Sequence, residues 1–263
     1  MLRIKALQIS LTWHSPAANH QYIESLLAKM PDEAFDVLVL PEMFTSGFTM
    51  QPEAIAEPMY GDTTIWMRDI ANRYDCLVMG SFVVEDAGHY FNRLLAVSAE
   101  KVEAYYDKRH LFRMANEHEH YACGETPVVF IWRNWRIRPL ICYDLRFPVW
   151  SRNTADDHYM PLAYDILVYV ANWPSRRIAH WDTLLRARAI ENQAYVIGVN
   201  RIGRDANDHE YTGNSLILSP QGEVLAAAED HTEAILSATL LSEEMRTYRQ
   251  RFPAWMDADT FAL

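Results

Sequence analysis

The sequence contains no long hydrophobic run and no cysteine framework. Its apolar stretches, such as residues 165–171, are far shorter than the ~20 residues that a membrane-spanning helix requires. The N-terminal segment MLRIKALQIS reads as a strand and lacks the successive regions of a secretion signal. The 3 cysteines, Cys76, Cys123 and Cys142, show no C-x-x-C spacing, which argues against disulfides and a zinc ribbon. We therefore expect a cytoplasmic protein with reduced thiols and no membrane segment.

Positive charge is also scarce. The chain has 24 Lys and Arg residues against 35 Asp and Glu residues, a formal net charge of −11 at pH 7. Such a balance repels the phosphates of nucleic acids and anionic lipid surfaces. The composition thus excludes nucleic acid and membranes as expected partners and favours a small molecule.

Apolar strands and amphipathic helices alternate along the chain without a linker, an internal repeat or a low-complexity segment. Buried strands are predicted at 36–40 and 165–171, a helix at 177–192, and closely spaced strands that can form hairpins between 76 and 106. We predict one domain over residues 1–263, an α/β sandwich of two sheets packed face to face with helices outside.

Polar residues stand at the ends of three predicted strands. Taken singly, Glu42 is explained as a solvated strand end, Lys108 as a surface lysine and Cys142 as a small buried hydrophobe. Together they suggest chemistry, because strand ends are where α/β proteins assemble their sites.

Cys142 is the candidate nucleophile of this set. A thiolate attacks and a thiol does not, so the site needs a base, for which Glu42 is the candidate, and a cation, for which Lys108 is the candidate. The turn after Cys142 leads into a helix whose first turn contains Pro148. This geometry exposes the sulfur and offers the backbone amide of Tyr143 as an oxyanion donor.

Three sequence blocks carry a family resemblance. LPEMF around Glu42, YYDKRHLF around Lys108 and ICYDLRFP around Cys142 resemble the signature blocks of the nitrilase superfamily, in the family's order. Residues 179–200 and 211–226 also look like the family's later helix and hairpin. Within the superfamily, the first two blocks look most like bacterial omega-amidases, which hydrolyse the terminal amide of 2-oxoglutaramate or 2-oxosuccinamate.

The resemblance implies a four-layer α-β-β-α sandwich that forms a homodimer. It implies a thiol amidohydrolase that acts on a small amide and water through a Cys thioester, with no cofactor and no metal. Glu117 matches a second glutamate that lies near the lysine and helps to hold the site. The chain has Cys123 where the family often has proline, a departure in the loop that leaves the catalytic positions intact.

Aromatic and cationic residues near these blocks are candidates for substrate binding. Phe44, Phe48 and Trp173 either wall a small pocket or belong to the core. Arg146 and Arg176 are alternative clamps for a substrate carboxylate, although Arg146 looks more like one half of a structural ion pair.

Three other readings remain open at this stage. The enzyme reading extends to another small amide, a nitrile or a carbamoyl amine, since the same three residues serve all of them. A metal site built from His118, Glu119 and His120, with His110 nearby, is a second reading, although no H-E-x-x-H helix is present. The third is an inactive interaction protein on the same fold, against which the intact Glu42, Lys108 and Cys142 argue.

Overall fold

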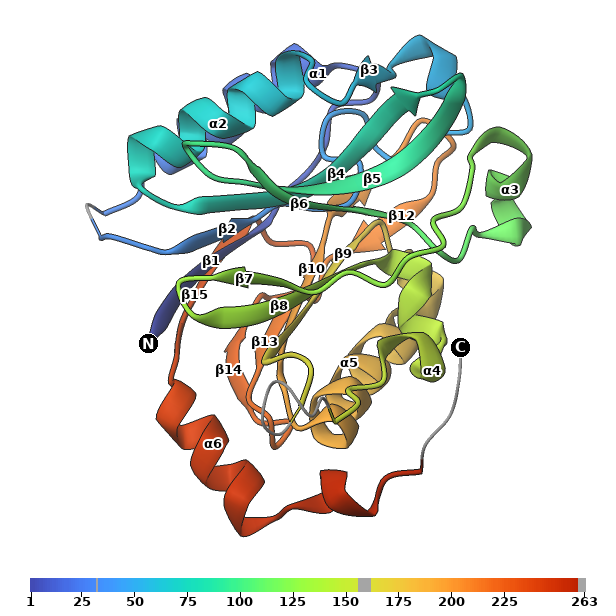
Figure 1. Ribbon diagram of the computed structural model, residues 1–263. Helices are drawn as coiled ribbons and strands as arrows, with labels where there is room; N and C mark the ends of the chain where they lie inside the picture. The colour runs from blue at the N-terminus through green and yellow to red at the C-terminus, as the bar shows by residue number, and fades with distance from the viewer. Residues whose placement is uncertain (32, 156–161, 260–263) are drawn as a thin grey trace.

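Two sheets lie face to face in the middle of the molecule, and helices cover their outer sides (Figure 1). The computed structural model describes residues 1–31, 33–155 and 162–259. The layering confirms the predicted α-β-β-α sandwich.

The first sheet mixes parallel and antiparallel pairs in the order β15-β1-β2-β4-β5-β6, with β3 beside β4. Its strands are β1 (Leu2–Gln8), β2 (Val37–Val39), β3 (Glu57–Pro58), β4 (Leu77–Asp86), β5 (His89–Val97), β6 (Val102–Asp107) and β15 (Ala234–Leu240). β1, β2 and β4 are parallel, whereas β4, β5 and β6 form the antiparallel hairpins that the sequence predicts.

The second sheet has a parallel centre and antiparallel edges, in the order β14-β13-β10-β9-β8-β7. Its strands are β7 (Phe130–Trp132), β8 (Trp135–Ile141), β9 (Ile166–Ala171), β10 (Tyr195–Asn200), β13 (Leu216–Leu218) and β14 (Val224–Ala227). The hairpin of β13 and β14 is the one predicted at 211–226. A separate ribbon pairs β11 (Ile202–Arg204) with β12 (Glu210–Thr212).

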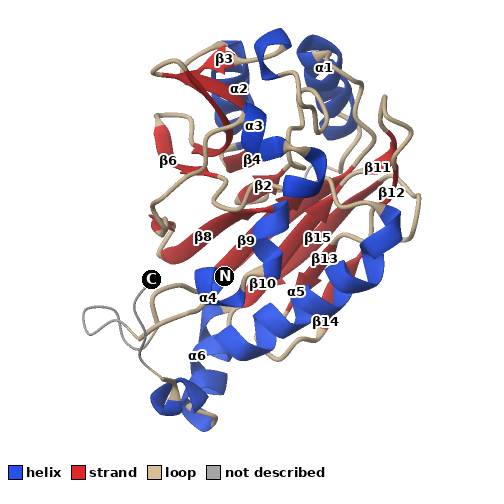
Figure 2. Ribbon diagram, turned by 90° about the vertical axis from the view of Figure 1, so that its right-hand side faces the viewer, coloured by secondary structure: helices blue, strands red, loops and turns tan. Residues whose placement is uncertain are grey.

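The helices lie on opposite sides of the sandwich (Figure 2). α1 (Pro16–Leu27) and α2 (Asp62–Tyr74) cover the first sheet, and α5 (Ile178–Asn192) covers the second. The remaining helices are short or terminal: α3 (Glu117–His120), α4 (Pro148–Ser151) and α6 (Ser242–Arg251). In the described part of the chain, none of the helices combines the length and the apolar character that crossing a membrane demands.

Alternating side chains along the strands explain why the layers form. Val37 and Val39 of β2 join the core between the sheets, whereas Leu38 joins the cluster under α1 and α2. Every residue of β9 is buried, because this central strand is covered on one face by the other sheet and on the other by α5. The continuous apolar run at 166–171 is the sequence signature of that double coverage.

The C-terminal arm was not anticipated from the sequence. β15 pairs with β1 at the edge of the first sheet, and α6 follows it. Arg249 of α6 is buried and anchors the arm, since its NH1 group lies 3.0 Å from a carboxylate oxygen of Asp165 and its Nε donates to the carbonyl of Gln193.

Candidate active site

The three predicted residues converge between the ends of the two sheets. Glu42 follows β2, Lys108 comes directly after β6, and Cys142 comes directly after β8. Glu42 and Lys108 are buried, and Cys142 is half-buried. Three segments far apart in the sequence therefore bring a carboxylate, an ammonium and a thiol to one place.

The carboxylate of Glu42 is held by four hydrogen bonds. Its Oε1 accepts from Lys108 Nζ and from Asn92 Nδ2, both at 2.8 Å. Its Oε2 accepts from the backbone N–H of Asn172 at 2.7 Å and from Asn172 Nδ2 at 3.4 Å. All the partners are donors, so both oxygens of Glu42 act as acceptors. The sequence reading missed both asparagines, although Asn172 precedes the strand-end residue Trp173.

Lys108 lies between two carboxylates. Its Nζ is 2.8 Å from Glu42 Oε1 and 2.9 Å from Glu117 Oε1, and it also stands over the ring of Phe48. Burial opposes the charge of Lys108, but the carboxylates of Glu117 and Glu42 outweigh this effect and raise its pKa. The lysine is therefore a fixed cation in the site.

Glu117 is the fully buried neighbour of that lysine. Burial raises its pKa, the charge of Lys108 opposes the rise, and the charge of Glu42 adds to it. Its second oxygen accepts the backbone N–H of Phe112 at 2.6 Å. These contacts place Glu117 where it holds Lys108 toward Glu42.

Cys142 has a left-handed backbone, with φ at +43°, at the start of a 3-10 helix over Cys142–Arg146. Pro148 then begins α4. Burial raises the pKa of the Cys142 thiol, and so do the negative charge of Glu42 and its hydrogen bond, while Lys108 opposes the rise. This environment favours the thiol over the thiolate, so attack on a substrate requires a base at the moment of reaction.

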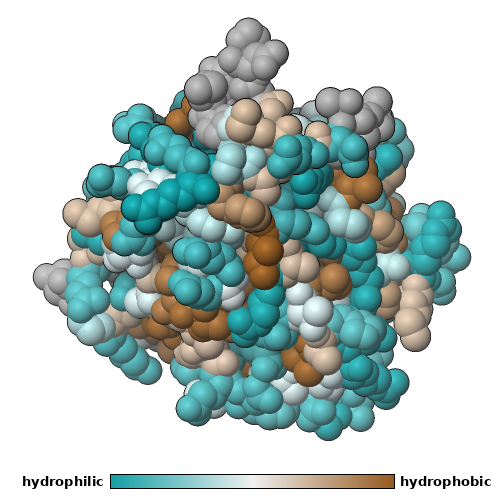
Figure 3. All heavy atoms as spheres, turned by 90° about the horizontal axis from the view of Figure 1, so that it is seen from below, coloured by the Kyte–Doolittle hydropathy of each residue, from teal (hydrophilic) through white to brown (hydrophobic). Residues whose placement is uncertain are grey.

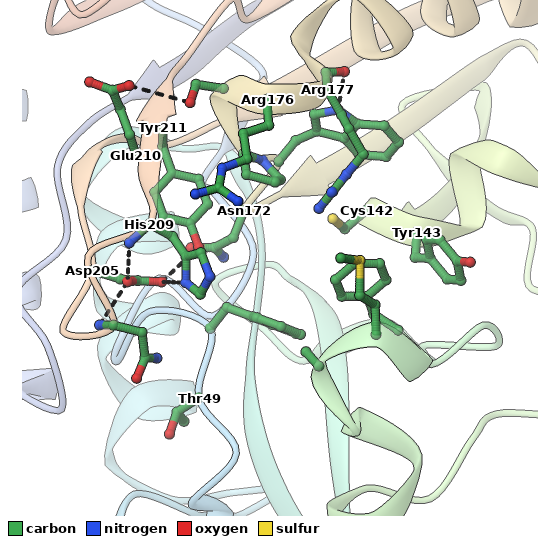
Figure 4. A pocket seen from close by; sticks show the side chains of 18 of the residues that line it. Thr49, Cys142, Tyr143, Asn172, Arg176, Arg177, Asp205, His209, Glu210 and Tyr211 are labelled. Atoms are coloured by element: carbon green, nitrogen blue, oxygen red, sulfur yellow. Dashed lines mark hydrogen bonds and ion pairs between the residues drawn. The ribbon is translucent and has the colours of Figure 1, made fainter.

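A cavity of about 550 Å³ opens above the sulfur (Figure 4). Phe48 and Trp173 line it together with Cys142 and Tyr143. Phe44, a predicted wall residue, does not: it is fully buried beneath α2, where its ring packs against Trp66 and Phe82. For Phe44 the core reading is therefore correct and the pocket reading is wrong.

Arg204, which pairs with Asp208 and Glu210, lines the cavity from the chain segment around β11, and three further arginines line it elsewhere: Arg146, Arg176 and Arg177. Within residues 1–31, 33–155 and 162–259, none of these three forms an ion pair with a carboxylate. The ion pair expected for Arg146 is wrong, because its guanidinium stacks 4.7 Å from the ring centre of Trp173 and bonds to His180 Nδ1 at 3.1 Å. Arg177 was missed, although it adjoins the predicted Arg176.

The ribbon of β11 and β12, which the sequence reading also missed, lines the cavity beside the segment that carries Arg176 (Figure 4). Asp205 organises its turn by accepting the backbone N–H groups of Asn207 and His209 and the hydroxyl of Tyr211. The cavity therefore has one cationic wall and one wall of mixed charge.

The alternative metal site is not assembled. Residues 117–120 form the helix α3, in which side chains two positions apart do not face each other, so His118 and His120 do not share a face. His110 is engaged elsewhere, with its Nδ1 2.8 Å from Asp144 Oδ1. Among the residues that the structure describes, no group of three or more His, Cys, Asp or Glu side chains is placed to hold a metal ion.

Comparisons with known proteins identify the family of this chain. The family model of the carbon-nitrogen hydrolases matches residues 3–250. The chain is 48% identical to "Omega-amidase YafV" of Escherichia coli (strain K12), over 100% of this chain and 98% of that protein. It is 32% identical to the "2-oxoglutaramate amidase" of Bacillus subtilis (strain 168), over 97% and 96% of the two chains.

The fold is also shared with solved structures. XC1258 from Xanthomonas campestris, described as a CN-hydrolase superfamily protein with an arsenic adduct in the active site, superposes with a TM-score of 0.95. Its sequence is 42% identical, and the match covers 100% of this chain and 98% of that one. The chain therefore belongs to the carbon-nitrogen hydrolases of the nitrilase superfamily, and it is a hydrolase of carbon–nitrogen bonds other than peptide bonds.

Proposed function

We propose that this protein is an omega-amidase that hydrolyses the terminal amide of 2-oxoglutaramate or 2-oxosuccinamate to the 2-oxo acid and ammonia. One observation carries the proposal: a thiol, a carboxylate and an ammonium meet at a cavity lined by the guanidinium groups of Arg146, Arg176 and Arg177, which form no ion pair with a carboxylate of the described residues. The full-length similarity to relatives named omega-amidase and 2-oxoglutaramate amidase supports the same substrate class.

The first chemical step forms a thioester. Glu42 takes the proton of the Cys142 thiol while the sulfur attacks the amide carbonyl carbon, and the carbonyl electron pair moves to oxygen. The resulting oxyanion is stabilised by Lys108 Nζ and by the backbone N–H of Tyr143. The carbon–nitrogen bond then breaks, the nitrogen takes the proton back from Glu42, and ammonia leaves.

The second step consumes water. Glu42 removes a proton from a water molecule, whose oxygen attacks the thioester carbonyl through the same oxyanion site. The carbon–sulfur bond breaks, the sulfur recovers a proton, and the acid is released. Throughout, Glu117 keeps Lys108 in place, which is consistent with the 2.9 Å contact between them.

The remote carboxylate of the substrate needs a cationic partner, because burying it unpaired is costly. Arg176 is exposed and Arg177 is half-buried, and Figure 4 shows both beside the cavity. Arg146 is less available, since it is engaged by Trp173 and His180. Burial and the charge of Arg177 also lower the pKa of Arg146. We therefore assign the carboxylate to Arg176 and Arg177.

Methylation of that carboxylate tests the assignment. It should reduce kcat/KM by ~10-fold or more, since hydrogen bonds to charged groups contribute about 1.5–3 kcal/mol. In Arg176→Gln and Arg177→Gln variants the preference for the free acid over the ester should shrink. The matched control is Arg186→Gln, which removes an arginine that pairs with Asp182 on α5, away from the cavity. A methyl ester or an aliphatic nitrile that proves the better substrate would overturn the omega-amidase proposal.

We also propose that residues 1–263 are a single hydrolase domain that works in the cytoplasm as a homodimer. The exposed apolar residues Ile190 and Phe252 support self-association: they lie on α5 and just after α6. Seen from below, the surface carries several small hydrophobic groups among hydrophilic ones (Figure 3). Light scattering coupled to gel filtration should give twice the chain mass, and a monomer at every concentration would contradict the proposal.

A further inference from the structure

Asp144 is a fully buried carboxylate that receives four hydrogen bonds. Its Oδ2 accepts the backbone N–H of Ile141 at 3.0 Å and the hydroxyl of Tyr106 at 2.7 Å. Its Oδ1 accepts the backbone N–H of His110 at 3.0 Å and lies 2.8 Å from His110 Nδ1. One side chain therefore ties together three parts of the chain: the end of β8, the end of β6 and the segment after β6.

The positions of these partners relate directly to the proposed catalytic groups. Asp144 is two residues after Cys142, and His110 is two residues after Lys108. The bond from Asp144 back to the N–H of Ile141 spans Cys142, whose left-handed backbone is unfavourable for a residue with a side chain. Asp144 follows Cys142 in the turn and its carboxylate bonds to Ile141, which precedes Cys142, so the turn is closed around the cysteine. The bonds to His110 then connect this turn to the segment that carries Lys108.

The surrounding contacts make this junction rigid. Tyr106 OH accepts Trp150 Nε1 at 2.9 Å and the backbone N–H of Arg109 at 3.3 Å. The ring of His110 stacks on Phe147, with 3.8 Å between ring centres. Because each donor already has its acceptor, a shift of Asp144 leaves buried polar groups unpaired.

We propose that Asp144 is a positioning residue that sets the separation of Cys142 and Lys108 by fastening the turn of the first to the segment of the second through Tyr106 and His110. This inference rests on the proposed roles of Cys142 and Lys108, but it goes beyond them. Neither Asp144 nor Tyr106 lines the cavity, so neither touches the substrate.

Asp144→Asn is the primary test. An amide presents one acceptor oxygen and one NH₂ group, so the NH₂ group must face a backbone N–H donor, that of either Ile141 or His110, and that hydrogen bond is lost. We expect kcat to fall by about 100-fold with KM little changed, the scale of a small displacement of reacting groups. Alkylation of Cys142 by iodoacetamide, followed by mass spectrometry, should slow in parallel.

A double-mutant cycle distinguishes a positioning role of Asp144 from a general loss of folding stability. If Asp144 acts by placing Cys142 against Lys108, then Asp144→Asn should lower kcat far less in a Lys108→Ala background than in the wild type. Asp165→Asn is the matched control, because Asp165 is also a buried carboxylate, bonded to Arg136 and Arg249 away from the cavity. It should lower the Tm while kcat stays near the wild-type value.

Tyr106→Phe keeps the test decisive if Asp144→Asn does not fold. It removes one of the four donors to Asp144, and it should lower kcat and the alkylation rate less than Asp144→Asn does. Its effect on kcat should likewise be far smaller in a Lys108→Ala background than in the wild type. Normal kcat and normal alkylation in a folded Asp144 or Tyr106 variant would overturn the proposal. So would effects that simply add to that of Lys108→Ala. If the wild type hydrolyses no omega-amide, the proposed function fails, and the alkylation rates still decide the role of Asp144.

Discussion

Replacing Cys142 with serine should leave the protein nearly inactive, with kcat lower by on the order of 10⁴-fold or more, as removal of a hydrolase nucleophile does. The site explains the size of the effect. Glu42 is placed to deprotonate a thiol, whose pKa is already raised by burial and by the charge of Glu42. A hydroxyl is a much weaker acid than a thiol, so the same base cannot activate serine effectively.

The covalent intermediate offers a direct measurement. With a slow amide substrate, mass spectrometry of the quenched wild-type protein should find the acyl group on Cys142. Cys76→Ser and Cys123→Ser are the matched controls and should retain both activity and adduct. Cys76 is buried, and its burial raises its pKa to about 12, whereas Cys123 is exposed. An adduct confined to Cys123 would show that the nucleophile is misassigned.

Replacing Lys108 with alanine should lower kcat by ~100-fold or more, the scale for loss of one oxyanion donor. The structure adds a second reason. Without the ammonium, the buried carboxylates of Glu42 and Glu117 face each other with no cation between them, and their repulsion favours protonation of one of them. A protonated Glu42 no longer serves as the base. The variant therefore loses the oxyanion donor, and its proton transfer is impaired as well.

Lys108→Arg should not restore the rate. Lys108 is 1% exposed and enclosed by two carboxylates and the ring of Phe48, a space that suits a compact ammonium rather than a planar fork. Lys101→Ala is the control, because Lys101 is an exposed lysine on the turn between β5 and β6. Steady-state kinetics on variants of verified fold decide the matter, and a near-normal kcat in Lys108→Ala would make the lysine a structural residue only.

Local sequence patterns determined much of this protein. Period-two alternation and short turns predicted the β4–β5–β6 hairpins and the β13–β14 hairpin, because both the pattern and the pairing lie within neighbouring residues. The strand ends that carry Glu42, Lys108 and Cys142 were found in the same way. The residue types of these three side chains indicate their chemistry, and the topology of an α/β sandwich explains why they converge.

The environment of the same residues was decided by the tertiary structure. Asn172 lies 130 positions from Glu42 and Asn92 lies 50 positions from it, yet both donate hydrogen bonds to its carboxylate. Nothing around Asn92 marks it within its strand, since a buried polar side chain is explained only by its distant partner.

The tertiary structure also decided which side chains point into the cavity and which point into the core. Phe44 and Phe48 are four residues apart in one loop, but the first is packed under α2 and the second faces the cavity. Arg146 follows Asp144 closely, yet that carboxylate is occupied by Ile141, Tyr106 and His110, and the arginine turns to Trp173 instead. Residue types and their periodicity thus determined the layers of the fold and the identity of the reactive groups. The tertiary structure selected the hydrogen-bond partners of each group, because only the assembled sheets bring donors and acceptors from distant parts of the chain within bonding distance.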